Sequence, residues 1–157
     1  MTTTHQFDHE ATTDLAFAAL ASGPTAPGVV RINPTTWSAG FGYDQGQLRA
    51  FPARLLTVAG QGSVNERGEL LHEGDVVAQL SLSMANAETV LAAAGMDLSD
   101  VVRLVVYSVD VDATLAAYGA IVERLALVGA TPPATLLGVT RLAIPGMAVE
   151  IELTAAS

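Results

Sequence analysis

Apolar and polar positions change their period along this chain, and the changes mark the expected elements. Two segments have helical spacing. In the first, Asp75 is a suitable N-cap, the periodic apolar positions continue to about Ala94, and Gly95 ends the helix. In the second, Asp112 caps a helix that runs to about Val128 and ends at Gly129. The predicted buried stripes are Val76, Leu80, Met84, Ala87, Leu91 and Ala94 in the first helix, and Leu115, Tyr118, Ile121, Val122 and Leu125 in the second.

The remaining apolar segments are short and favour strands. Val101–Ser108 is rich in β-branched residues, and Pro132–Glu152 contains two short strands joined by a Pro-Gly turn. Further strands are predicted at Val29–Ile32, as an edge strand, and in a hairpin that pairs Gln47–Ala50 with Arg54–Ala59 across Phe51-Pro52. The longer loops are Asn33–Gly46, rich in Gly, Pro and aromatic residues, and Gly62–Asp75, with a turn at Asn65–Gly68.

This order, β-β-α-β-α-β-β, predicts one α/β (α+β) domain over residues 29–157, preceded by an N-terminal arm over residues 1–28. Right-handed crossovers would place both helices on the same face of the sheet. The strand Val101–Ser108 is nevertheless apolar on both sides, and such a strand needs a cover on each face. We therefore expect an obligate oligomer in which another copy covers the bare face.

Composition removes several classes of chemistry. The 157 residues carry a formal net charge of −9, and their seven basic residues are all Arg. The lack of Lys excludes a Schiff-base lysine, and the lack of Cys excludes a thiol nucleophile and a thiolate metal site. Because nucleic-acid binding requires clustered positive charge, we expect no nucleic-acid partner.

The expected compartment is the cytoplasm, without membrane association. No apolar run approaches the roughly 20 residues that span a bilayer, and the N-terminus lacks the basic start of a secretory signal. His5 and His9 have the i, i+4 spacing of a helical metal pair, but no zinc-site pattern surrounds them, so no metal is expected.

The last strand carries Glu150 and Glu152, whose spacing of two places both carboxylates on the same side of a sheet. A carboxylate in so apolar a strand is costly unless a partner holds it or a site uses it. Glu150 is thus a candidate general base or water-orienting group. The alternative is a structural ion pair with Arg103 or Arg141, and for Glu152 a structural role is favoured.

Several motifs in order resemble the Rid (YjgF) family of reactive-intermediate deaminases. They are LLTVAGQ, GELLHEGDVVAQ, VLAAAG, VVRLVVYSVDVD and VTRLAIPGMAVEIE, and the likeness covers roughly residues 33–153. The resemblance implies a chorismate-mutase-like fold with a mixed sheet and two helices on one face. It also implies a homotrimer with ligand clefts between subunits, and hydrolysis of imines and enamines to a keto acid and ammonia without a metal or organic cofactor.

The resemblance also implies site residues, position by position. The family's catalytic glutamate corresponds to Glu150, and its site tyrosine to Tyr43. A Ser-Gly pair corresponds to Ala59-Gly60, so the glycine is kept and the hydroxyl is lost. The remaining predicted ligand-binding positions are Tyr118 in place of an Asn, Ala134 at or next to a carboxylate-gripping Arg, Leu136 in place of a Cys, and Trp37.

The missing Arg separates two functional interpretations. A bidentate Arg–carboxylate contact is strong and directional, so its loss disfavours substrates derived from amino acids. One interpretation is a deaminase of imines or enamines with a non-standard substrate, for example one without a carboxylate. The other is a non-catalytic trimer that binds a small molecule or protects other proteins. The ribonuclease activity often attached to the family is disfavoured by the charge of −9.

Overall fold

The computed structural model describes residues 28–37 and 41–157. The predicted arm 1–28, with His5 and His9, therefore lies outside the described residues except for Gly28. The elements are β1 (Val29–Ile32), β2 (Gly46–Arg49), β3 (Leu55–Gly62), α2 (Val76–Ala93), the 3₁₀ turn η2 (Leu98–Asp100), β4 (Val101–Ser108), α3 (Val111–Ala117), α4 (Gly119–Leu127), β5 (Ala134–Gly138) and β6 (Val149–Ala156).

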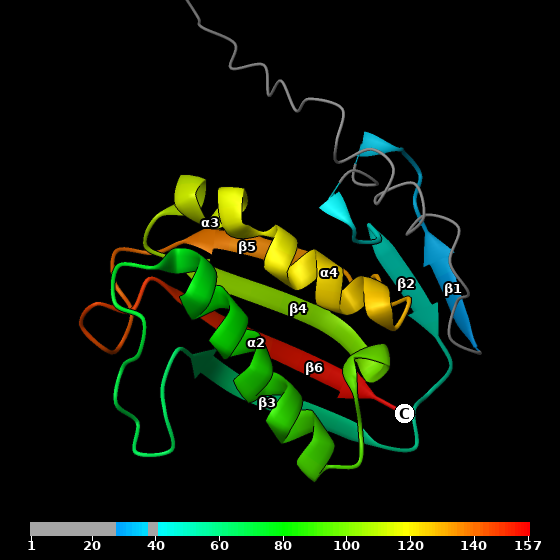
Figure 1. The fold of residues 1–157 in the computed structure, drawn as a ribbon. Coiled ribbons are helices and arrows are strands. Elements are labelled where there is room, and N and C mark those ends of the chain that lie inside the picture. Colours follow the sequence, from blue (N-terminus) through cyan, green and yellow to red (C-terminus); the bar gives the residue numbers. More distant parts are fainter. Residues whose placement is uncertain (1–27, 38–40) are drawn as a thin grey trace, which may run out of the picture.

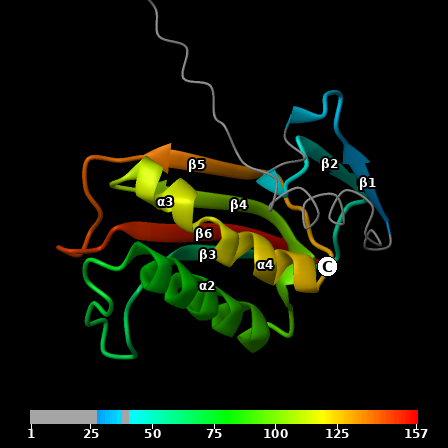
Figure 2. The ribbon, with the colours of Figure 1, turned by 45° about the horizontal axis from the view of Figure 1, so that its top comes forward.

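A four-stranded sheet in the order β3-β6-β4-β5 forms the body of the molecule. β4 pairs with β5 in parallel, while β6 runs antiparallel to both β3 and β4. All three helices lie on the same face of this sheet, and the β1–β2 ribbon lies beyond its end (Figures 1 and 2). The expected mixed α+β fold with one-sided helical cover is confirmed. The last two strands are not neighbours, because β4 lies between them.

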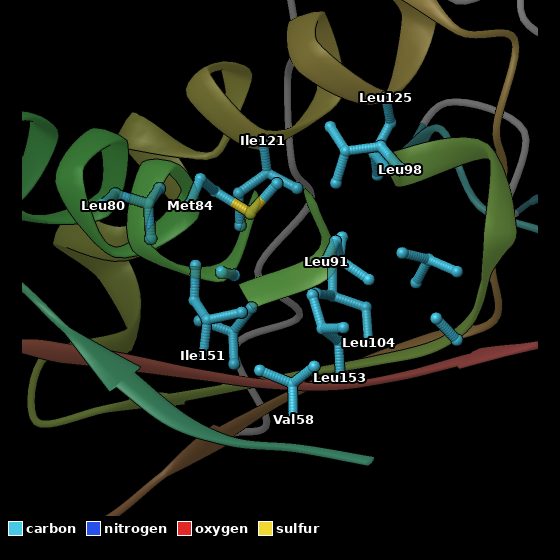
Figure 3. Close-up of a cluster of buried hydrophobic side chains, with 14 of the residues drawn as sticks. Val58, Leu80, Met84, Leu91, Leu98, Leu104, Ile121, Leu125, Ile151 and Leu153 are labelled. Atoms are coloured by element: carbon cyan, nitrogen blue, oxygen red, sulfur yellow. The ribbon is translucent and has the colours of Figure 1, made fainter. Parts of the chain in front are cut away.

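The hydrophobic core fills the space between this sheet and the helices (Figure 3). Alternate residues of each strand point into it, as the two-residue period of a strand requires. On β6 these are Val149, Ile151 and Leu153, each at most 1% exposed, as predicted. The helices contribute Leu80, Met84, Leu91, Ile121 and Leu125.

Helix α2 confirms the prediction made from its capping residues. The side chain of Asp75 accepts a hydrogen bond from Ala78 N at 2.9 Å, and Gly95 ends the helix with φ +68°. Positive φ is costly for residues with a Cβ, so glycine suits this position. By length and hydropathy alone α2 could cross a membrane. Its buried stripe packs on β3 and β6 instead, which is typical of a core helix.

The second predicted helix is wrong in two details. Its N-cap is Asp110 rather than Asp112, and it breaks at Tyr118 into α3 and α4. Gly119, which follows the break, has low helix propensity. The buried positions Thr114 and Ala117 of α3 continue at helical spacing into Ile121 and Leu125 of α4, so the predicted member Leu115 lies beside this stripe and remains 36% exposed.

The predicted hairpin across Phe51-Pro52 is also wrong. β2 pairs with β1, in the register Val30↔Leu48, and β3 pairs with β6 of the main sheet. Two backbone hydrogen bonds between Arg54 and Ser157 join the start of β3 to the C-terminus. β2 and β3 follow each other in the sequence but pair with other strands, and the local pattern does not reveal those partners.

A buried carboxylate fastens the β1–β2 ribbon to the body. Asp44 is fully buried and accepts hydrogen bonds from Arg31, Asn33, Gln47 and Thr131 at 2.7–3.0 Å. Its backbone N–H also donates to the carbonyl of Thr131 at 3.1 Å. Burial alone would raise the pKa of Asp44, but these four side-chain hydrogen bonds together hold that pKa below its ordinary value.

The sheet face opposite the helices has no cover from the described part of the chain. Leu55 on β3 is 67% exposed and Leu137 on β5 is 45% exposed. Val105, also on this face, is nearly fully buried but does not belong to the hydrophobic core. Regular alternation along β4 would place Val101 on the same side as Val105. Val101 instead belongs to the core, because the register of β4 against β6 shifts between Val101 and Arg103.

Replacement of Asp44 by Asn is expected to lower the free energy of unfolding at neutral pH, and to lower it less in acid. Since the folded-state pKa of Asp44 is lowered, its charge stabilises the fold above the ordinary Asp pKa of about 3.9, and this contribution is lost as the pH falls through the folded pKa. In urea unfolding, wild type should exceed Asp44→Asn in stability at pH 7, and the difference should shrink below about pH 4. A difference that stays constant down to pH 2 would contradict this assignment.

Candidate functional site

Cross-strand pairing places Glu150 in a row of side chains on the uncovered face. Tyr107 on β4 lies opposite Glu150 on β6, and Leu137 on β5 lies opposite Tyr107. On the other side of Glu150, β3 contributes Gly60 and Gly62. We call Leu137, Tyr107, Glu150 and Gly60 the Glu150 row. The adjoining row contains Thr135, Val105 and Glu152.

Glu150 lies directly against Gly60. A Cβ atom at position 60 would stand 1.8 Å from Oε1 and 2.7 Å from Cδ of Glu150. Gly60 is also where the register of β3 against β6 shifts, between Val58 and Gln61, and this irregularity includes Ala59. A β-bulge of this kind re-aims neighbouring side chains and often lies next to a functional site. Glycine at position 60 therefore gives the carboxylate its place on the sheet.

The carboxylate of Glu150 has no hydrogen bond or ion pair within residues 28–37 and 41–157. The alternative ion pairs with Arg103 and Arg141 are not formed there. Glu152 behaves differently, because it accepts a hydrogen bond from the Tyr107 hydroxyl at 3.1 Å. This bond, with burial and the charges of both glutamates, raises the pKa of Tyr107, whereas Arg103 lowers it. Tyr107 therefore stays a neutral hydroxyl donor at physiological pH.

Tyr43 belongs to an aromatic cluster in the loop between β1 and β2. Its ring centroid lies 6.1 Å from that of Trp37 and 6.4 Å from that of Phe41. Trp37 is 62% exposed and Phe41 is 41% exposed, while Tyr43 is half-buried. Desolvation by burial raises the pKa of Tyr43, so this hydroxyl remains protonated as well.

Tyr118 lies close enough to Tyr43 for the two hydroxyls to interact. Burial, and to a smaller extent the charge that Tyr43 would carry on ionisation, raises the pKa of Tyr118 to about 12. The ring of Tyr118 packs against the hydrophobic core at the α3–α4 break. The described contacts therefore form two groups, Tyr43 with Trp37 and Tyr118, and Glu150 with Gly60. No described contact joins one group to the other.

Strand β5 directs the predicted positions Ala134 and Leu136 toward the helices. Both side chains pack against the hydrophobic core. Because successive side chains alternate across a sheet, Thr135 and Leu137 are the β5 residues that share the face of Glu150. Neither Thr135 nor Leu137 supplies a positive charge to this face.

Within residues 28–37 and 41–157, no group of three or more His, Asp and Glu side chains could hold a metal ion. The polar groups of the Glu150 row are the carboxylate of Glu150 and the hydroxyl of Tyr107, which can accept and donate protons respectively.

The family model for endoribonuclease L-PSP, which describes the YjgF/Rid proteins, matches residues 35–157 of this chain. The chain belongs to the Rid family. A search of curated proteins found no match.

Solved structures agree with membership in the Rid family. YyfB from Yersinia pestis, a Rid protein of unknown function, is 35% identical, with a TM-score of 0.74 over 83% of this chain and 99% of that one. YjgF from E. coli is 28% identical, with a TM-score of 0.58 over 73% and 87% of the two chains. E. coli TdcF with bound serine is 26% identical, with a TM-score of 0.60 over 85% and 94%.

Sequence reasoning did not select Tyr107, Thr135 or Leu137 within this Rid fold. The sequence shows which residues of β4 and β5 alternate between the two faces of the sheet. The order of the strands was needed to place these residues beside Glu150. Tyr107 in particular was assigned to an apolar strand, and its hydrogen bond to Glu152, 45 positions away, has no local signal.

Gly60→Ala is expected to displace the Glu150 carboxylate and to cost about 0.5–1 kcal/mol of stability, because the new Cβ overlaps the end of a flexible side chain that can move aside. The cost should fall in a Glu150→Ala background, where the obstructing group is absent. Urea unfolding of wild type, both single variants and the double variant measures this coupling, expected at about 0.5–1 kcal/mol. Additive free-energy changes would show that Gly60 and Glu150 do not need each other.

Proposed function

We propose that this Rid protein is a hydrolytic deaminase of reactive imines or enamines, acting on a non-standard substrate at a cleft between subunits. The observation that carries the proposal is the placement of Glu150. Its carboxylate lies against Gly60 on an uncovered sheet face, with no partner in the described part of the chain. An unpaired, half-buried carboxylate at a bulge is expensive as a purely structural feature and is suited to holding a water or a cation.

In the proposed reaction, Glu150 accepts a proton from water while the water oxygen attacks the iminium carbon. The C–O bond forms and the C=N π electrons move to nitrogen. Glu150 then passes this proton to the amine nitrogen. As the C–N bond breaks, the oxygen lone pair forms the carbonyl, ammonia leaves, and the hydroxyl proton is released to solvent. The negative charge of Glu150 also stabilises the cationic iminium before attack. No metal or organic cofactor is needed for this sequence.

The proposed site is completed by other copies of the chain in a homotrimer. Support comes from the uncovered sheet face, on which Leu55 and Leu137 are exposed, and from membership in the Rid family. Closed symmetry would allow each copy to cover the bare face of a neighbour. Trp37, Tyr43 and Tyr118 would then approach a Glu150 row from across the subunit boundary, with Ala59 and Gly60 beside the ligand.

A non-catalytic trimer that binds a small molecule or protects other proteins is the second candidate. It is favoured by the loss of polar groups that the resemblance associates with the site. Ala59 lacks a hydroxyl, Tyr118 is a core-packed phenol, and Ala134 and Leu136 face the core. Under either proposal we place the protein in the cytoplasm.

The ribonuclease activity in the family's description receives no support from this chain. The net charge is −9, there is no Lys, and the two glutamates of β6 share the uncovered face. Phosphate backbones bind to clustered cations, and a face carrying two carboxylates repels them.

Glu150→Gln is expected to slow imine hydrolysis about a hundredfold, because the amide keeps the size of the side chain and loses its basicity. Imines formed in situ by an amino-acid oxidase or an amine oxidase, with semicarbazide trapping of what remains, give the rate. Glu152→Gln is the matched control and should retain most activity, since Glu152 is paired with Tyr107. Equal rates for wild type and Glu150→Gln would remove Glu150 from the mechanism.

A further inference from the structure

The charged side chains of the Glu150 row and of the adjoining row are of one sign. The Glu150 row and the adjoining row supply two carboxylates, Glu150 and Glu152, and no cation. Arg103 lies in the next row along β4, opposite Thr154 and on the far side of Glu152 from Glu150. A ligand group bound at Glu150 therefore lies closer to negative charge than to positive charge.

The rest of the Glu150 row is apolar or aromatic. Leu137 is 45% exposed, and Tyr107 stands between it and Glu150. With neighbouring strands about 4.8 Å apart, Leu137 and Glu150 lie about 10 Å from each other across the sheet. The hydrogen bond from the Tyr107 hydroxyl to Glu152 fixes the direction of the ring. The surface thus offers a carboxylate at one end and a hydrocarbon surface at the other.

We propose, on the basis of the function proposed above, that the substrates are cationic imines of amines that lack a carboxylate and carry an apolar or aromatic substituent. The iminium nitrogen lies at Glu150, and the substituent lies over Tyr107 and Leu137. The ring of Tyr107 adds a cation–π contribution. An α-carboxylate in the same pose would stand within a few ångströms of Glu150.

The size of this discrimination follows from Coulomb's law. Two like charges separated by about 6 Å at an effective dielectric constant of about 20 repel strongly enough to change a binding constant at least about tenfold. No positively charged side chain of the two rows offsets this repulsion. Carboxylate-bearing imines are therefore the disfavoured class at this site.

A matched pair of stable ligands tests the proposal without requiring turnover. Phenethylamine and phenylalanine share an aromatic ring and an ammonium group and differ by the carboxylate. Titration calorimetry of the full-length protein should show phenethylamine binding at least about tenfold more tightly than phenylalanine. Equal affinity, tighter binding of phenylalanine, or no binding of either ligand would overturn the proposal.

Two variants show whether the charge at this face sets the preference. Thr135→Arg places a cation in the row beside Glu150 and should reverse the preference toward phenylalanine. Thr57→Arg adds the same charge to the same sheet face, but beside Thr154, four positions from Glu150 along β6, and should leave the preference unchanged. A preference that Thr135→Arg does not alter in a protein of unchanged assembly would count against the proposal.

Binding preference and the rates of imine hydrolysis, measured on the same protein, test the ligand class and the deaminase assignment separately. If phenethylamine is preferred but neither an amine-derived nor an amino-acid-derived imine is hydrolysed, the ligand class stands and the deaminase assignment fails. If hydrolysis occurs and the amino-acid-derived imine is processed with the higher kcat/KM, the deaminase assignment stands and the ligand class fails.

Discussion

The one-sided helical cover of the sheet is the constraint on which the rest of this structure depends. α2, α3 and α4 all lie on the same face, and they shelter the alternate residues of β3, β4, β5 and β6 that form the core. The opposite face keeps β-strand alternation but has no layer from the described chain. It presents Leu55 and Leu137 together with Glu150, Tyr107 and Glu152. Apolar and acidic groups are therefore combined on one face that the described part of the chain leaves uncovered.

Placement of Glu150 follows from three local features of this face. Alternation along β6 places Glu150 on the opposite face from the core residue Ile151. The register of β3 against β6 shifts beside Glu150, and Gly60 leaves room there for its carboxylate. Tyr107 lies opposite Glu150 and donates its hydroxyl hydrogen bond to Glu152. Glu152 therefore has a hydrogen-bond partner, while Glu150 has none among the described residues. Two glutamates from one strand thus have different contacts, which their neighbours determine.

The sequence predicted what depends on local pattern and missed what depends on distant pairing. The cap at Asp75, the end at Gly95, and the inward face of β6 were read correctly from spacing alone. The pairing of β2 with β1 and the break at Tyr118 were not, since both depend on tertiary contacts that override a plausible local alternative. For the candidate site, the family resemblance supplied Glu150 and Gly60 as separate positions, and the strand order was needed to place Tyr107, Thr135 and Leu137 beside Glu150.

Sedimentation equilibrium at micromolar concentration tests most directly whether copies of this chain cover the bare face. Wild type should sediment at about 48 kDa, three copies of the 16.1 kDa chain. Leu55→Glu, on the bare face, should dissociate the assembly, whereas Leu127→Glu, at an 87% exposed position on α4, should not. A wild-type protein that remains a stable 16.1 kDa monomer would contradict the account.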